Sequence, residues 1–197
     1  MQNTRQSIRQ IIRARRAQLS SQEQQDAARQ LVTQCQRVEE FQHQNIALYL
    51  SVDGELETRP LIEWLWQQGK NLFLPVIHPF SKGQLLFLHY RPDSRMVANR
   101  YGILEPKLAK NDICPIKYLD VICTPLVAFD DKGQRLGMGG GYYDRTLAPW
   151  FHQGLGPKPL GIAHDNQWVE TLPTEAWDVP LPKIVTPSQI WQWEINQ

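Results

Sequence analysis

The sequence is short of several features that mark membrane, secreted and nucleic-acid-binding proteins. It has only three cysteines and no CxxC pair, so neither a disulfide framework nor a zinc site is indicated. No apolar run approaches the roughly 20 residues that a membrane span needs. With 21 basic and 20 acidic residues, the net charge of +1 argues against bulk electrostatic capture of nucleic acid or of an anionic membrane. We expect a cytoplasmic protein that acts on small molecules.

No repeat, low-complexity tract or long linker divides the 197 residues, so a single domain spanning residues 1–197 is predicted. Strand and helix patterns alternate along the chain. This alternation predicts an α/β fold with an open, mostly parallel sheet and helices on both faces, Rossmann-like in its three layers. Two amino-terminal helices are expected to pack on the sheet. A monomer is expected.

Glycines are concentrated in residues 130–145, which hold five of the chain's 12. The apolar run 121–129 before this segment predicts a buried strand broken at Pro125, and residues 142–150 after it have helical spacing. A strand, a glycine loop and a helix start place backbone N–H groups and a positive dipole end in one concavity, which suits phosphate. Taken alone, a glycine run between a strand and a helix more often indicates a tight connection, and the segment is neither a Walker loop nor a dinucleotide fingerprint.

The first 20 residues predict an amphipathic helix that carries arginines before any acidic residue. Its isoleucines and its arginines are expected on different faces, namely Ile8, Ile11 and Ile12 against Arg5, Arg9 and Arg13. Like charges at steps of four repel one another. The pattern therefore indicates either a solvated face or a place where an anion binds.

An acidic turn follows the strand that is predicted over residues 45–51 and precedes a helix from about residue 59 to residue 68. Thr58 is expected to cap this helix, with Pro60 in its first turn. In open α/β sheets, ligands bind at the carboxyl ends of strands, where Glu55 and Glu57 would lie. We interpret Glu57 as a charge that complements the helix dipole. His78 and His89 are interpreted as surface residues.

Residues 135–145, Arg-Leu-Gly-Met-Gly-Gly-Gly-Tyr-Tyr-Asp-Arg, resemble the signature of the 5-formyltetrahydrofolate cyclo-ligase family, also called methenyltetrahydrofolate synthetases. The resemblance extends to both ends of the chain. It implies a ligase that forms a C–N bond by closing 5-formyltetrahydrofolate to 5,10-methenyltetrahydrofolate, with release of ADP and phosphate. It further implies ATP as co-substrate, Mg²⁺ as cofactor and a phosphorylated formyl intermediate, an iminium phosphate.

The same resemblance implies roles for particular residues. Arg9 and Arg135 are the expected catalytic residues, since they would neutralise charge on the transferred phosphoryl group. Asp144 and Asp178 are the expected Mg²⁺ ligands, because Mg²⁺ typically takes one or two carboxylates. The expected folate contacts are Leu50, Glu55, Tyr101 and Tyr142. The expected ATP site comprises Arg5, Arg9, Arg135, Leu136, Gly137, Met138, Gly139, Gly140, Gly141, Tyr142 and Tyr143.

The sequence departs from the family pattern near Asp178. Trp177 stands where the family has a histidine, and Pro182 stands where it has an acid. Two other classes of protein stay open at this point. A phosphosugar isomerase or CoA transferase-like enzyme would act without consuming ATP, and a non-catalytic folate- or nucleotide-binding protein would bind without turnover.

Overall fold

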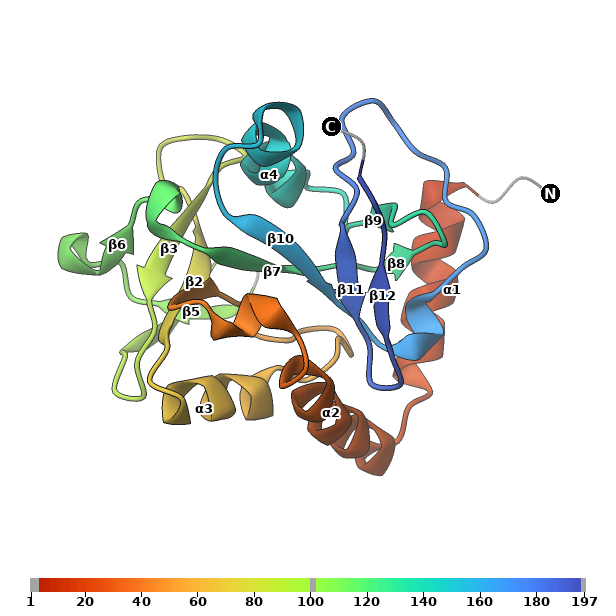
Figure 1. The fold of residues 1–197 in the computed structure, drawn as a ribbon, viewed down its shortest axis with the longest axis horizontal. Coiled ribbons are helices and arrows are strands. Elements are labelled where there is room, and N and C mark those ends of the chain that lie inside the picture. The colour runs from red at the N-terminus through yellow and green to blue at the C-terminus, as the bar shows by residue number, and fades with distance from the viewer. Residues whose placement is uncertain (1–3, 100–101, 196–197) are drawn as a thin grey trace.

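The computed structural model describes residues 4–99 and 102–195 of the chain (Figure 1). Tyr101, an expected folate contact, lies outside these residues. Within the described ranges, no helix is long and apolar enough to cross a membrane. The α-helices are α1 (Arg5–Ala17), α2 (Ser21–Cys35), α3 (Arg59–Gln67) and α4 (Tyr142–Gln153), and the short 3-10 helices are η1 (Glu39–Gln42), η2 (Lys110–Asp112), η3 (Ile116–Tyr118) and η4 (Asp165–Gln167).

An eight-stranded mixed sheet forms the centre of the described chain. Its strands are β1 (Asn45–Ala47), β2 (Asn71–Ile77), β3 (Leu85–His89), β6 (Ile113–Cys114), β7 (Val121–Pro125), β10 (Lys158–Ile162), β11 (Lys183–Val185) and β12 (Ile190–Gln192). They are ordered β12-β11-β10-β7-β1-β2-β3-β6. The central strands from β11 to β2 are parallel, and the outer strands are antiparallel to their neighbours. Two-stranded sheets are formed by β4 (Met96–Ala98) with β5 (Leu104–Pro106), and by β8 (Ala128–Phe129) with β9 (Arg135–Leu136).

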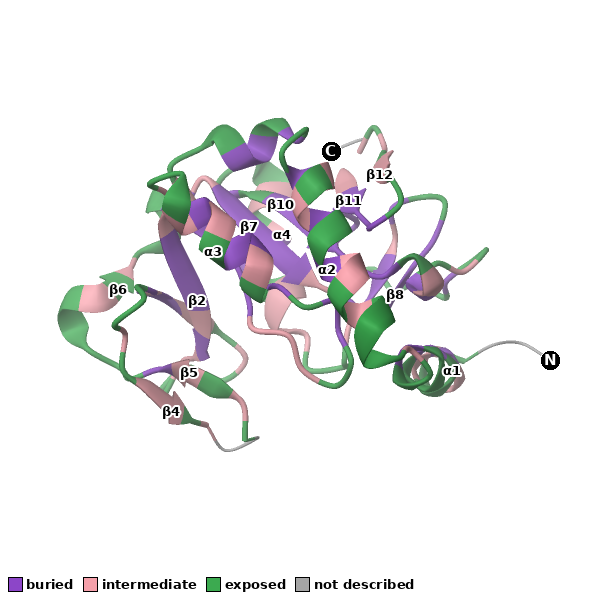
Figure 2. Cartoon of the chain, turned by 90° about the horizontal axis from the view of Figure 1, so that it is seen from below, coloured by how far each residue is buried: buried purple, intermediate pink, exposed green. Residues whose placement is uncertain are grey.

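Helices cover both faces of the large sheet, because alternate residues of each strand point to opposite sides. On one side, Ile46 of β1 packs in a core cluster with Leu31 of α2 and Leu65 of α3. On the other side, Ile122 of β7 packs in a cluster with Leu147 of α4. Figure 1 shows α2 and α3 on one side of the sheet and α4 on the other, and Figure 2 shows the buried strands between partly exposed helices. The predicted α/β fold with a mostly parallel sheet is confirmed.

The first helix lies at the side of the molecule, where it contacts β8 and η4 (Figure 1). Its apolar side chains Ile8 and Ile12 form a separate cluster with Leu136 of β9. Ile11 is 44% exposed, so the prediction of a face with three isoleucines is wrong. At about 100° per residue, positions 5, 8, 9, 12 and 16 share one stripe and position 11 does not. Arginines and buried isoleucines therefore occupy the same face of α1.

The strand order reverses direction at the pair formed by β1 and β7. The next strand along the chain, β2, lies on one side of β1, whereas the later strands β7, β10 and β11 lie on the other. The two strands are in register at Ile46 with Val121 and at Ala47 with Ile122. Ligands of open α/β sheets bind outside the carboxyl ends of strands at such a point. β1 is followed by the segment that holds Glu55, and β7 is followed by the β8–β9 pair, after which the glycine loop begins.

Two local predictions are wrong in detail. β1 ends at Ala47, earlier than the predicted residue 51. Thr58 has helical dihedral angles and does not cap α3; its hydroxyl donates to the carbonyl oxygen of Tyr49 at 2.7 Å. Glu57 does complement the helix start, because its Oε1 accepts from the backbone N–H of Arg59 at 2.9 Å.

Candidate functional site

The glycine loop, residues 137–141, joins β9 to α4 and forms the candidate anion site. Gly139 has a φ of 103°, and Gly141, at the N-cap of α4, has a φ of 65°. Side chains other than glycine rarely accept such backbone angles, which explains the glycine at both positions. Within the described residues, no side chain caps the N-terminus of α4. The positive end of the helix dipole is therefore available to an anion in front of the loop.

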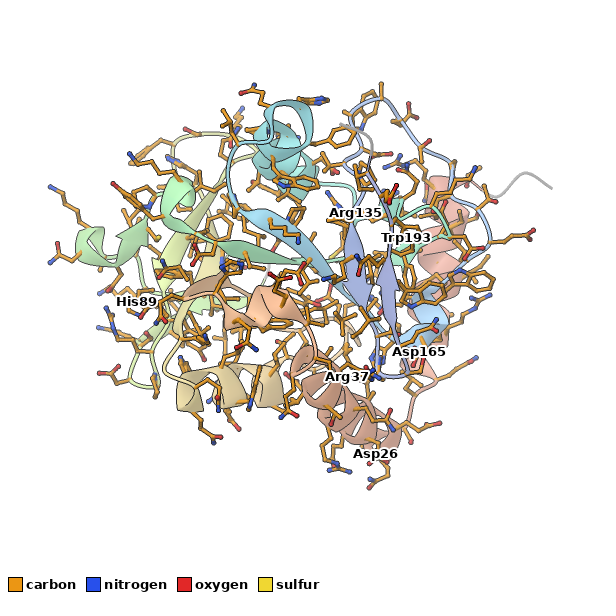
Figure 3. The ribbon with its side chains drawn as sticks, viewed as in Figure 1. Asp26, Arg37, His89, Arg135, Asp165 and Trp193 are labelled. Atoms are coloured by element: carbon orange, nitrogen blue, oxygen red, sulfur yellow. The ribbon has the colours of Figure 1, made fainter. Side chains whose placement is uncertain are left out.

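Arg135 supplies a buried cation at the start of this segment (Figure 3). Its side chain is 2% exposed, and its Nη2 donates to Oδ1 of Asp144 at 2.5 Å. Its Nε has no partner in the described part of the chain. Burial lowers the pKa of Arg135, and the negative charges of Asp144 and Asp178 oppose this effect. A buried guanidinium with an unused donor beside a glycine loop is suited to a phosphate oxygen.

Asp178 lies next to this ion pair, although it comes from a distant part of the chain. The backbone N–H of Val179 donates to Oδ1 of Asp144 at 3.3 Å. Arg5 donates to both carboxylate oxygens of Asp178, with 3.0 Å between Nη2 and Oδ1, and the N–H of Glu175 donates at 2.8 Å. Burial raises the pKa of Asp178, but the hydrogen bonds from Arg5 and Glu175 outweigh it and hold the pKa below its ordinary value. The two predicted metal ligands are thus brought together.

Arg9 extends from α1 to the glycine loop. Its Nε donates to the carbonyl oxygen of Gly137 at 2.8 Å, and a Cβ added to Gly139 would lie 3.6 Å from its Nη2. Burial, followed by the positive charge of Arg5, lowers the pKa of Arg9. Arginines from α1, the glycine loop and both aspartates therefore converge, as the family resemblance implies.

The other residues expected at the ATP site differ in their surroundings. Leu136 is buried against α1, so it can meet a ligand only through its backbone, whereas the side chain of Met138 is exposed. Tyr142 and Tyr143 begin α4 and are half-buried. Burial, followed by the negative charge of Glu55, raises the pKa of Tyr143. The Tyr143 phenol is therefore within electrostatic range of Glu55, which links the glycine loop to the second candidate segment.

Glu55 lies in the segment that follows β1 and is 7% exposed. Its Oε2 accepts from the backbone N–H of Val52 at 3.1 Å. Burial raises its pKa to about 7, although the Val52 hydrogen bond and the charge of Arg16 act against the rise. Glu55 also lines an open groove of about 540 Å³ together with Gln24 of α2. Leu50 is partly buried against the core that β1 shares with α2 and α3.

The sequence patterns did not single out two buried polar residues near Glu55. Arg16 on α1 is 1% exposed, and its Nη2 donates to Oδ2 of Asp53 at 3.0 Å. His164, which follows β10, is 3% exposed. Arg16 was predictable in principle, since it lies seven residues after Arg9 and so on the same face of the helix. His164 belongs to no sequence motif or periodic pattern, and only the order of the strands in the sheet brings it close to Arg16.

The two histidines interpreted as surface residues lie away from these groups. Nδ1 of His78 accepts from two neighbouring backbone N–H groups. His89 contacts Arg91, and Figure 3 shows it on the opposite side of the molecule from Arg135.

The two departures from the family pattern leave Asp178 in place. Trp177 is 66% exposed, so the side chain at this position points to solvent. The carbonyl oxygen of Pro182 accepts from the backbone N–H of Trp193 at 2.9 Å, which ties the segment to the C-terminal strand region. Neither residue removes Asp178 from the neighbourhood of Asp144.

Comparison with known proteins agrees with this geometry. Residues 1–187 match the model of the 5-formyltetrahydrofolate cyclo-ligase family. The chain is 53% identical over 184 residues to the 5-formyltetrahydrofolate cyclo-ligase of Escherichia coli K12, covering 93% of this chain and 100% of that protein. It is 54% identical over 179 residues to the cyclo-ligase of Haemophilus influenzae, covering 90% of this chain and 94% of that protein.

Solved structures show the same fold. The structure of 5,10-methenyltetrahydrofolate synthetase from Aquifex aeolicus superposes with a TM-score of 0.80 at 27% identity, covering 95% of this chain and 92% of that chain. The corresponding enzyme from Mycoplasma pneumoniae, at 23% identity, matches in fold with a TM-score of 0.71 over 93% of this chain and 98% of that chain. The family match, the curated relatives and the converging site residues lead to one conclusion: this chain belongs to the 5-formyltetrahydrofolate cyclo-ligase family, a family of ligases.

Proposed function

We propose that this protein closes 5-formyltetrahydrofolate to 5,10-methenyltetrahydrofolate in a reaction that depends on ATP and Mg²⁺ and releases ADP and phosphate. The observation that carries the proposal is that α1 contacts both the glycine loop and the segment that holds Glu55. α1 spans both segments, since Arg9 contacts the loop and Arg16 contacts Asp53 beside Glu55. Seven residues of helix rise about 10 Å, so an ATP on the loop and a folate at Glu55 would lie close together.

ATP binding would use the loop and the arginines that surround it. A phosphate in front of α4 would accept from backbone N–H groups of the loop and benefit from the helix dipole. Arg9 and Arg135 would neutralise the γ-phosphate as it transfers, and Arg5 would contribute positive charge from the same face of α1. Leu136 would contribute backbone groups, and the glycines would allow close approach. The remaining proposed contacts are Gly137, Met138, Gly139, Gly140, Gly141, Tyr142 and Tyr143.

Asp144 and Asp178 are the residues that we propose would hold Mg²⁺. The Val179 hydrogen bond ties the residue after Asp178 to Asp144, and each of the two carboxylates accepts from an arginine that a phosphate could engage instead. Two carboxylates with nucleotide oxygens and water are a donor set that suits Mg²⁺. When bound, the ion would neutralise negative charge on the phosphate oxygens.

The folate half of the site would be formed by Glu55, Leu50, Tyr142 and Tyr101. The carboxylate of Glu55 would accept from N–H groups of the pterin and favour the positive charge that grows on the one-carbon unit. Leu50 would line the apolar side of the pocket. Tyr101 is proposed from the family resemblance alone.

Phosphorylation makes the formyl group reactive, because a formamide oxygen is otherwise a poor leaving group. The formyl oxygen attacks the γ-phosphorus, and the bond between that phosphorus and ADP breaks. N10 then attacks the formyl carbon of the resulting iminium phosphate. The C–O bond breaks, phosphate leaves and the N10 proton passes to solvent, which yields the methenyl cation. Such a reaction needs in-line placement and charge neutralisation rather than a nucleophilic side chain.

We propose that the whole chain, residues 1–197, acts as one domain, as a monomer and in the cytoplasm. Its three cysteines are free thiols, two of them buried, which fits a reducing compartment.

A direct test follows the near-ultraviolet absorbance of the methenyl product when the protein is mixed with 5-formyltetrahydrofolate, ATP and Mg²⁺. The proposal predicts product only when all three are present, with one ADP released per turnover. Product formed without ATP would contradict it, and so would binding of both ligands without turnover.

A further inference from the structure

Two buried polar residues, Arg16 and His164, have N–H groups that find no partner among the described residues. Arg16 is 1% exposed; its Nη2 is bonded to Asp53, while its Nε and Nη1 are buried with no partner among the described residues. His164 is 3% exposed, and its Nε2 is likewise buried and unpartnered in that part of the chain. Burying unpartnered donors lowers stability, so such groups need an explanation, and a ligand-binding role is one.

His164 presents a donor and not an acceptor. Its side chain accepts from the backbone N–H of Gln167, and Nδ1 is the acceptor because Nε2 has no partner within residues 4–99 and 102–195. A neutral imidazole that accepts at Nδ1 carries its proton on Nε2. Burial and the charge of Arg16 lower the pKa of His164 to about 4, so the ring is neutral at physiological pH. All the unsatisfied groups of Arg16 and His164 are therefore N–H donors.

Arg16 lies within electrostatic range of Glu55, and His164 lies within electrostatic range of Arg16. Arg16 is bonded to Asp53, two residues before Glu55, and its charge acts on the pKa of both Glu55 and Tyr49. The hydroxyl of Tyr49 donates at 3.3 Å to the carbonyl oxygen of the last residue of β10, two residues before His164. Acceptor and donors thus gather at the carboxyl ends of β1 and β10, which lie on either side of β7.

We propose that Arg16 determines specificity for the pterin ring by donating from Nε or Nη1 to its 4-oxo oxygen, with His164 Nε2–H as a second donor. This inference rests on the proposed function. One edge of the reduced pterin presents a 2-amino group, then N3–H, then the 4-oxo oxygen. A carboxylate can accept from the 2-amino group and N3–H together, one hydrogen bond to each of its oxygens. The 4-oxo oxygen next to N3–H then needs a protein donor that lies next to this carboxylate. Glu55 followed by Arg16 and His164 provides this order.

The test compares 5-formyltetrahydrofolate with an analogue in which sulfur replaces the 4-oxo oxygen. The analogue keeps the 2-amino group and N3–H, so it keeps the partners of Glu55, but its sulfur is a weak acceptor. Calorimetric titration without ATP measures the affinity of both compounds. We expect the wild-type protein to prefer the oxygen compound by roughly tenfold or more.

The Arg16→Gln variant separates loss of the hydrogen bonds from the larger size of sulfur. We expect its affinity for 5-formyltetrahydrofolate to fall roughly 10–100-fold and its preference for oxygen over sulfur to disappear. Arg13→Gln is the matched control, because Arg13 is exposed on the same helix and bonds the same Asp53. This control should keep the wild-type affinity and preference, and the KM for ATP should be unchanged in both variants.

Each outcome has a separate meaning. Wild-type protein that binds both compounds equally overturns the inference, even if Arg16→Gln fails to fold. A folded Arg16→Gln protein that keeps the full preference overturns it too. If the wild-type protein binds neither compound, the proposed function itself fails.

Discussion

The two halves of the site, one around the glycine loop and one around Glu55, differ in how completely their buried polar groups are paired. At the glycine loop, charged side chains are paired with one another, Arg135 with Asp144 and Arg5 with Asp178. Around Glu55, the polar groups are buried and incompletely satisfied, with two nitrogens of Arg16 unpartnered among the described residues.

This difference corresponds to the charge of the two proposed ligands. A polyphosphate carries enough negative charge to take the place of a carboxylate beside an arginine, so the arginines stay compensated with or without ATP. A pterin ring is neutral and must be recognised by directional hydrogen bonds from desolvated groups, which the free protein leaves unmade at a cost in stability. Four substitutions test whether the two halves differ in this way.

The largest effect is expected for Asp144→Asn in the glycine-loop half. The carboxamide oxygen can still accept from Arg135 and from the N–H of Val179, but the carboxylate proposed to hold Mg²⁺ is lost. Methenyl formation should fall by about 10²–10³-fold at saturating ATP and Mg²⁺, while the circular dichroism spectrum stays unchanged. Asp93→Asn, on an exposed turn, is the control. Full activity in Asp144→Asn would remove this residue from the metal site.

Glu55→Gln is expected to weaken folate binding in the other half by about 100-fold, because a neutral amide cannot accept from two donors in a fork. The KM for 5-formyltetrahydrofolate should rise while the KM for ATP does not. In the wild-type protein, the KM for folate should also rise as the pH falls below about 7, where Glu55 gains its proton. Glu57→Gln, two residues away and exposed, should show none of these changes.

The same variant should reveal a stability cost. The folded-state pKa of Glu55, about 7, lies above the ordinary value of 4.5, so folded protein holds a proton that unfolded protein has released between these pH values. Wild-type stability should therefore rise as the pH falls from 7 toward 4.5, and above pH 7 the full cost of the buried charge remains. Glu55→Gln should then be more stable than wild type at pH 8, by up to about 3 kcal/mol. A less stable variant would contradict the buried-charge interpretation.

Arg9→Gln is expected to raise the KM for ATP by about tenfold and leave the KM for folate unchanged, because one charge-assisted contact is lost. Arg13→Gln provides the comparison, since Arg13 is exposed and bonds Asp53 instead of the loop. Steady-state kinetics with each substrate varied in turn gives both constants. An equal rise in the two KM values would make Arg9 a structural residue.

The smallest effect is expected for Gly139→Ala, which should lower the free energy of unfolding by about 1 kcal/mol because alanine disfavours a positive φ. Gly137→Ala should be nearly neutral, since Gly137 has no positive φ and a Cβ there would lie 3.7 Å from its nearest neighbour, Nη1 of Arg135. Urea unfolding of the two variants compares them directly. Equal stabilities would mean that the loop adapts and is not held in one conformation.

Features that depend on short stretches of sequence were predictable. The glycine loop, the strand break at Pro125 and the helix start at Tyr142 follow from residues that are adjacent in the chain. Arg5, Arg9 and Asp178 could be placed near the loop only through the family resemblance, because no local pattern connects residues so far apart.

Features that depend on tertiary packing were missed or wrong. Ile8 and Ile12 are buried and Ile11 is exposed, because α1 turns the stripe that holds Ile8 and Ile12 toward β8 and β9. Threonine is a residue type that often caps helices, yet the hydroxyl of Thr58 donates to the carbonyl oxygen of Tyr49, in the segment after β1. His164 lies within electrostatic range of Arg16 because β10 is two strands from β1 in the sheet. This strand order cannot be read from the spacing of residues in the sequence.

The central claim is that the two halves bring the formyl oxygen of the folate to the γ-phosphorus of ATP. It is tested most directly with 5-formyltetrahydrofolate labelled with ¹⁸O in the formyl group, followed by mass spectrometry of the phosphate released. The account predicts that the label passes from the formyl group to inorganic phosphate in every turnover. Unlabelled phosphate, with the label released to water, would contradict it.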